Sequence, residues 1–268
     1  MAGNTKALRL RIKSVTSTLQ LTKAMGLVAS SKIRRANEAM QKAREYTAAL
    51  DSSVSQLTCR EECKKSPYMR TGGERERIVV IAGDRGLAGG YNANVFRLCR
   101  NYPNAEFIPI GKRACERFSQ PVNSSEDYTF ADASALADKL CEDFKNGEFD
   151  RLGVIFTRYR SVMSQEADIK WLLPFVCGEE KSDNAGIIFE PDSLSVLNLV
   201  AREYVAGIIT ACIRESIACE VSARRMAMDS AGKNAKQMID ELGLDYNRAR
   251  QGAITQEITE IVAGSGNS

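Results

Sequence analysis

The sequence contains no histidine among its 268 residues. Histidine is the commonest general base and metal ligand near neutral pH, so the usual Ser-His and Cys-His nucleophile pairs are missing as well. The eight cysteines are scattered, mostly inside apolar periodic segments, and no secretory signal peptide precedes them. We therefore expect reduced thiols, and the composition weighs against an enzyme.

Long hydrophobic runs are also missing. The longest, Val205 to Ile213, is interrupted by a threonine and is much shorter than the roughly 18 residues of a membrane span. With 44% hydrophobic and 26% charged residues and a net charge of +3, the composition is that of a soluble globular protein. We expect no membrane span in the chain itself.

Proline is absent from both ends, since all six prolines lie between residues 67 and 191. Apolar or small residues recur in alternating steps of four and three from Leu8 to Leu57, over seven heptads. This spacing is a coiled-coil signature and predicts one long helix over residues 1–58. Small residues at Thr22, Gly26 and Ala29 predict a close approach of another helix there.

A second proline-free segment, residues 192–268, begins at Asp192, a candidate N-cap. Its heptad spacing is weaker, because Glu215, Asp229 and Lys233 interrupt it. Two unrelated surface helices remain an alternative, but antiparallel pairing with the first helix explains better how the chain returns to its start. The expected seam comprises Leu197, Ala201, Tyr204 or Val205, Ile208, Cys212, Cys219, Ser222, Met226, Met238, Leu242 and Ala249.

Residues 75–190 alternate short β-rich runs with helical ones. This pattern predicts an inserted Rossmann-like α/β domain with a mainly parallel, doubly wound sheet, whose last two strands could pair as a hairpin. The fold class is therefore α/β, with a long antiparallel coiled coil formed by both termini. The predicted strands are 77–83, 106–111, 151–159 and 167–175, the predicted helices are 93–101 and 134–146, and residues 59–76 form a linker.

A glycine-rich segment, "GDRGLAGGYNANV", follows the first predicted strand at residues 83–95. Such a turn can hold phosphate on backbone N–H groups, so a nucleotide-binding enzyme is an alternative function. The Walker and Gly-x-Gly-x-x-Gly spacings are both missing, however, and Asp84 would repel phosphate. We favour glycines that only let the chain turn tightly against the sheet.

Two cysteine pairs have spacings that bear on a possible site. Cys59 and Cys63 could share a helix face, but without a second pair at zinc spacing or any histidine we expect no metal there. Cys212 and Cys219 are one heptad apart and are interpreted as small apolar seam residues.

The N-terminal stretch contains eight Lys or Arg residues and no acid before Glu38. A transit peptide, a nucleic-acid-binding arm and a helix facing an acidic protein partner share this composition. The heptads run through the stretch without a break, which argues against a removable peptide. No aromatic residue occurs before Tyr46, which argues against nucleic acid. An acidic protein partner is the favoured interpretation.

The last helix has an unusual surface. Ile254, Ile258 and Ile261 form one stripe, and the residues around it are mainly uncharged and polar rather than Lys/Glu pairs. Such a helix suits neither a core nor an ordinary solvent-facing surface.

Several motifs resemble those of the gamma subunit of F-type ATP synthases, and the resemblance covers essentially the whole chain. They are "IKSVTSTLQLTKAMGLVASSKIRRA" (12–36), "GDRGLAGGYN" (83–92), "FEPD" (189–192), "SARRMAMDSA" (222–231) and "YNRARQGAITQEITEIV" (246–262). The resemblance implies a rotor shaft, in which both terminal helices turn inside a ring of catalytic and non-catalytic subunits and couple ion flow to ATP. It implies no catalytic site and no cofactor or metal on this chain.

The resemblance also implies contact residues. Those expected to contact or support contact with the catalytic ring are Met25, Arg224, Arg250, Gln251, Thr255 and Glu257. Glu190 matches an acid that meets the membrane ring, and Ile187 and Phe189 stand where the family has two aromatic contacts, so the details of this foot contact are open. Gly83 and Val221 are further departures, and the redox segment of the plastid version is missing.

The implied partners are the alpha and beta subunits of the catalytic head, the epsilon subunit and the c-subunit ring, in a hetero-oligomer with one copy of this chain. Nucleic acid is not expected. The start of the chain coincides with the family's start, which favours a bacterial protein, peripheral on the cytoplasmic side of the cell membrane. Protons and sodium are both open as the coupling ion.

Overall fold

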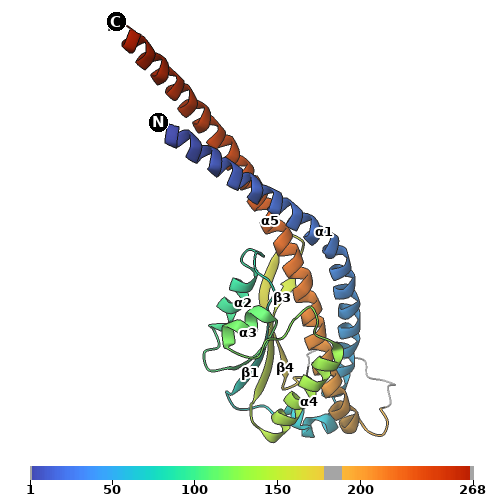
Figure 1. The fold of residues 1–268 in the computed structure, drawn as a ribbon. Helices are drawn as coiled ribbons and strands as arrows, with labels where there is room; N and C mark the ends of the chain where they lie inside the picture. The colour runs from blue at the N-terminus through green and yellow to red at the C-terminus, as the bar shows by residue number, and fades with distance from the viewer. Residues whose placement is uncertain (1, 178–188, 266–268) are drawn as a thin grey trace. The chain divides into compact units, whose positions relative to one another are not determined.

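The computed structural model describes residues 2–177 and 189–265, and side chains from residue 5 to residue 262 apart from that of residue 257. The chain divides into two compact units. The first comprises Met1–Ala29 and Arg225–Ser268, and the second comprises Ser30–Arg224. Two helices, α1 (Ala2–Thr58) and α5 (Ser193–Ser265), contribute residues to both units (Figure 1).

In the first unit, α1 and α5 pack antiparallel through glycines. A Cβ added to Gly26 would lie 3.7 Å from the Cβ of Met228, and one added to Gly232 would lie 3.6 Å from the hydroxyl of Thr22. Residue numbers rise along α1 as they fall along α5, so the predicted antiparallel pairing is confirmed here. The small residues allow the two backbones to approach closely.

The predicted heptad seam of α1 is confirmed, because every described seam position from Leu8 to Leu57 is buried or half-buried. In α5 the seam is confirmed as far as Ser222, but Met226 and Met238 are wrong, since they are 37% and 50% exposed. The buried or half-buried positions instead keep a regular spacing: Met228, Gly232, Ala235, Ile239, Leu242, Tyr246, Ala249 and Ala253. Several of these positions are glycine or alanine, which give a weak hydrophobic signal. The sequence pattern therefore selected bulkier neighbouring residues that lie outside the seam.

The second unit contains a four-stranded sheet in the order β2-β1-β3-β4. Strand β1 (Glu76–Ile81) pairs in parallel with β2 (Glu106–Ile110) and with β3 (Arg151–Tyr159). Strand β4 (Gln165–Leu173) pairs antiparallel with β3 as a hairpin. The mainly parallel sheet and its terminal hairpin are therefore confirmed.

Helices cover both faces of this sheet (Figure 1). Helices α2 (Tyr91–Cys99) and α3 (Lys112–Phe118) pack on one face through Val95 and Ala114, against Ile78, Val80 and Ile155. Helix α4 (Phe130–Asn146) and α5 pack on the other face, where the largest core cluster lies. This layering matches the predicted α/β architecture.

Three short elements were not predicted. Helix α3 has only seven residues, and the linker contains two 3-10 helices, η1 (Glu61–Lys65) and η2 (Pro67–Met69). In η2 the side chain of Ser66 accepts a hydrogen bond from the backbone N–H of Tyr68. Elements this short give too few turns for periodicity to be read.

Within the second unit α1 and α5 are again closely packed. Gly207 of α5 faces Tyr46 and Leu50, whose side chains would lie within 3 Å of an added Cβ. One window of α5 is apolar enough by composition to cross a membrane, but 61% of that window is buried inside the structure. Such burial is typical of the core helix of a soluble domain.

Candidate functional sites

The glycine-rich loop lies at the carboxyl end of β1, where Rossmann-like domains hold phosphate. There the carboxylate of Asp84 accepts hydrogen bonds from the backbone N–H groups of Lys112, Ser125 and Glu126, at 2.9 to 3.0 Å. The hydroxyl of Ser124 donates a fourth, at 2.8 Å. Burial of Asp84 works to raise its pKa, but these hydrogen bonds outweigh burial and the net pKa is lowered.

A second carboxylate, that of Glu220 on α5, lies beside Gly83. Glu220 is 3% exposed and pairs with Arg224, whose guanidinium donates at 2.5 Å. Burial raises the pKa of Glu220, and the bond to Arg224 opposes that shift. Arg224 also donates to the backbone carbonyl of Gly86 at 3.3 Å, so the pair attaches the loop to α5.

These contacts argue against phosphate binding at the loop. Lys112 is the first residue of α3, and its N–H already bonds to Asp84, so an acid of the chain occupies the position that an anion would need. Asp84 and Glu220 would also repel a phosphate. The hydroxyl of Tyr91 donates to the carbonyl of Ser216 on α5. The loop therefore attaches the α/β domain to α5. This structural role adds to the favoured interpretation that the glycines let the chain turn tightly.

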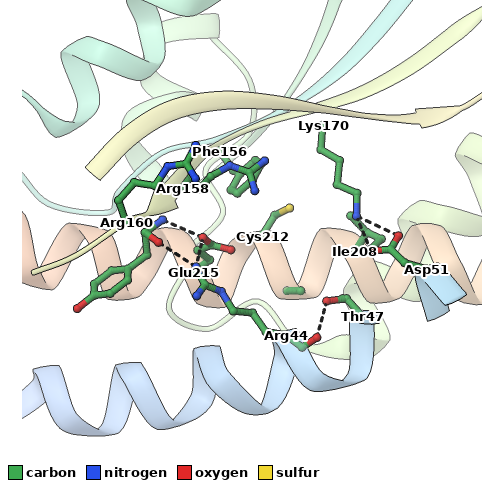
Figure 2. A pocket seen from close by; sticks show the side chains of 12 residues that line it. Arg44, Thr47, Asp51, Phe156, Arg158, Arg160, Lys170, Ile208, Cys212 and Glu215 are labelled. Carbon is green, nitrogen blue, oxygen red and sulfur yellow. Dashed lines mark hydrogen bonds and ion pairs between the residues drawn. The ribbon is translucent and has the colours of Figure 1, made fainter. Parts of the chain in front are cut away.

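A pocket of about 430 Å³ lies between α1, α5 and the β3–β4 hairpin (Figure 2). Arg44 of α1 donates to Glu215 of α5 at 2.7 Å and to the carbonyl of Tyr159 at 3.0 Å. Glu215 also accepts from the N–H of Tyr159 at 2.8 Å. The two helices thus hold the end of β3 between them. The sequence pattern suggested that Glu215 interrupts the heptad seam. In the structure Glu215 is buried in the seam, because its charge is paired with Arg44.

The other charges around this pocket are paired as well. Lys170 contacts Asp51 at 3.0 Å (Figure 2). The hydroxyl of Tyr204 donates to the same carboxylate at 2.8 Å. Arg158, which also lines the pocket, contacts Asp168 at 2.6 Å. Paired groups of this kind stabilise the packing of the hairpin against the two helices. Over residues 2–177 and 189–265, no cluster of His, Cys, Asp or Glu could hold a metal ion.

The residues expected to contact the catalytic ring near the C-terminus are on the surface of α5. Arg250, Gln251 and Thr255 are exposed, and the hydroxyl of Thr255 donates to the carbonyl of Gln251 at 3.0 Å. The stripe of Ile254, Ile258 and Ile261 is 47%, 56% and 70% exposed. The side chain of Glu257 lies outside the described residues.

The remaining expected contact residues have varied surroundings. Met25 is half-buried, whereas Arg224 is engaged within the chain by Glu220 and Gly86. Phe189 packs partly against the core, with the Arg60 guanidinium 4.7 Å from its ring centroid, and Glu190 is exposed. Ile187 lies outside the described residues.

Sequence reasoning missed the Arg44–Glu215 pair and the hydrogen bonds of Asp84. An acid in an otherwise apolar helix is a usable signal, since such an acid is buried only with a partner. Nothing in the sequence identifies the partner as Arg44, which is 171 residues away. The donors to Asp84 are mostly backbone groups and carry no residue-type signal.

Comparisons with known proteins agree over the length of the chain. The family profile described as ATP synthase matches residues 4–266. The ATP synthase gamma chain of Ruminococcus albus is 37% identical over 282 residues, with 99% of each chain covered. That of Acetobacterium woodii, described as sodium ion specific, is 35% identical with 99% of each chain covered.

Solved structures share the fold. A chain of the Euglena gracilis mitochondrial ATP synthase matches with a TM-score of 0.67 and 17% identity, covering 98% of this chain and 94% of that one. A chain of the Tetrahymena thermophila central stalk and c-ring matches with a TM-score of 0.62 and 20% identity, covering 79% and 99%.

Proposed function

Because this chain belongs to the family of ATP synthase gamma chains, we propose that it is the rotating central shaft that couples ion flow through a membrane ring to ATP synthesis or hydrolysis in a catalytic head. The observation that carries this proposal is the antiparallel pair of terminal helices, whose seam is apolar and whose C-terminal end exposes an isoleucine stripe. The chain supplies mechanical coupling and no catalytic site.

The mechanism follows from the asymmetry of one shaft among several equal subunits. A single chain presents different residues to each catalytic subunit, so each subunit is biased toward a different nucleotide state. Rotation then exchanges these contacts. The coupling requires stiffness. Within the first unit the close packing of α1 on α5 supports it, and within the second unit the bonds of Arg224 to Glu220 and Gly86 support it.

The exposed end of α5 is the proposed contact with the catalytic ring. Arg250, Gln251 and Thr255 are exposed, and Glu257 is included in the proposal because the family resemblance implies it. Neutral hydrogen-bonding groups suit a contact that must form and break at each step, because a desolvated ion pair would be costly to separate. Met25 and Arg224 complete the proposed set, with Arg224 acting through the loop that it holds.

The basic face of α1 is proposed to meet acidic loops of the catalytic subunits. All eight Lys and Arg residues before Asn37 are exposed, and they lie off the seam. Individually such exposed pairs contribute little, so they would guide the contact more than stabilise it.

We propose Ile187, Phe189 and Glu190 as contacts with the membrane ring. The exposure of Glu190 supports this role, and the ring of Phe189 lies against the guanidinium of Arg60. We also propose the alpha, beta and epsilon subunits and the c-ring as partners, with one copy of this chain in a complex peripheral to the cytoplasmic side of a bacterial cell membrane.

The function is tested by tagging the chain, purifying its complex gently from its own cells, and combining native mass spectrometry with an ATP hydrolysis assay. We expect one copy of this chain with three copies each of two larger subunits, and hydrolysis only in the complex. A chain that is isolated alone and that binds or hydrolyses ATP would refute the proposal.

Gln251→Leu is expected to reduce ATP-driven ion pumping by the purified complex by up to about tenfold, because one interfacial hydrogen bond is lost and a polar partner is left unpaired. The matched control is Gln237→Leu on the same helix, where the side chain bonds only to Glu241 at 2.9 Å. Pumping by vesicles that contain each variant gives the comparison. Equal losses in the two variants would count against the proposed contact.

A further inference from the structure

Two cysteines that are far apart in the sequence lie together in the second unit. Cys59 directly follows α1 and Cys177 lies just beyond β4, yet their Sγ atoms are 2.7 Å apart across a sequence separation of 118 residues. Cys177 is exposed and Cys59 is half-buried, whereas the other six cysteines are buried. This pair is therefore the most accessible to reagents in solution.

The geometry permits a covalent bond with little movement. A disulfide bond is about 2.05 Å long, so the two sulfur atoms need to approach by less than about 1 Å. Cys63 is fully buried, although it is only four residues from Cys59, and so it is a poor competitor. The tertiary fold, not the local sequence, selects Cys177 as the partner.

The surroundings of the pair are polar and charged. The Cys177 S–H donates toward Cys59, and this contact raises the pKa of the Cys177 thiol. The positive charge of Lys64 opposes that shift, while Glu61 adds to it. The reactive species in exchange is the thiolate, so reaction at this pair is expected to be faster at alkaline pH.

We propose that Cys59 and Cys177 are a thiol-modification site, at which exchange with a low-molecular-weight disulfide such as glutathione disulfide forms an intrachain disulfide. The thiolate of exposed Cys177 attacks one sulfur of the small disulfide and expels one thiolate. The thiolate of Cys59 then attacks the Sγ of Cys177 in this mixed disulfide and expels the second. The two cysteines lose two protons and two electrons, and the small disulfide is reduced to two thiols.

The bond would join the end of α1 to the chain just after β4, and would enclose the whole sheet in one covalent loop. Closing a long loop restricts the unfolded chain, so the oxidised protein is expected to unfold at a higher temperature than the reduced protein. This site does not depend on the proposed function, since it involves only contacts within the second unit.

The test incubates the purified full-length chain with glutathione buffers of increasing oxidised fraction, quenches with acid, alkylates the remaining thiols and maps peptides by mass spectrometry. We expect one peptide pair joined through Cys59 and Cys177, and an intact mass, measured before alkylation, that is lower by two hydrogens. Cys63→Ser should leave this product unchanged. Cys59→Ser should instead trap Cys177 as a mixed disulfide with glutathione.

Three results would overturn the proposal. One is a bond between Cys59 and Cys63, which Cys63→Ser would abolish. Another is complete alkylation of both Cys59 and Cys177 at the highest oxidised fraction. The third is a mixed disulfide in the unmodified sequence that never resolves. Each variant is first checked for a native melting transition under reducing conditions, so that a misfolded chain is not scored.

Discussion

Gly111→Ala is expected to lower the free energy of unfolding of the second unit by about 4 kcal/mol. Gly111 has a φ of 98°, which disfavours any residue with a Cβ, and an added Cβ would overlap the carbonyl oxygen of Ala82. Neither strand can move away, because Ala82 donates to Ile110 and Gly111 donates to the side chain of Asn123. Strain and overlap therefore act together at the end of β1 and β2.

The measurement is denaturant unfolding followed by tryptophan fluorescence, since Trp171, in β4, is the one tryptophan of the chain. Gly90→Ala is the matched control in the same unit. Gly90 has a φ of −81° and the nearest atom lies 3.7 Å from an added Cβ, so alanine there should change the free energy of unfolding by no more than about 1 kcal/mol. Similar midpoints for Gly111→Ala and the original sequence would show that the β2–α3 turn relaxes freely.

Asp84→Ala is expected to lower the free energy of unfolding by about 3 kcal/mol at neutral pH, because three backbone N–H groups and one hydroxyl lose a charged acceptor. Asp127→Ala is the control, because it removes an acid from the loop that supplies the Ser125 and Glu126 donors. Asp127 is exposed, and its backbone N–H merely donates to Ser124, so an effect within about 0.5 kcal/mol is expected.

The effect of Asp84 should depend on pH. Its pKa is lower in the folded protein than in the unfolded chain, so its stabilising contribution is complete above the unfolded pKa and is lost as the pH falls through the folded pKa. The difference in unfolding free energy between Asp84→Ala and the original sequence should therefore shrink in acid. A difference that stays constant down to strongly acidic pH would assign the effect to packing instead of charge.

Sequence patterns predicted the long elements well. The heptads from Leu8 to Leu57 extend over enough turns to define one face, and β3 occupies the predicted residues 151–159. Helix α3 was missed because its two turns are too short for a periodic signal, although Gly111 marks its start. Errors at Met226 and Met238 had another cause, since the buried face of α5 there runs through Met228, Gly232 and Ala235, and two of these three residues carry little hydrophobic signal.

The candidate sites show where sequence reasoning reaches its limit. The sequence indicated that Asp84 would repel phosphate, and its position before a glycine-rich turn was sufficient for that inference. It could not identify what Asp84 binds, because backbone N–H groups at residues 112, 125 and 126 are brought to it only by the fold. The approach of Cys177 to Cys59 is equally hidden, since local spacing favoured Cys63.

The isoleucine stripe at residues 254, 258 and 261 has a consequence for how the chain is produced. A surplus copy exposes this stripe to water, and an exposed apolar row on a helix invites self-association. If other subunits cover the stripe, as proposed, the chain should be made in step with them. Overproduction of the chain alone is then expected to favour aggregates, and co-production with its proposed partners is expected to raise the soluble yield.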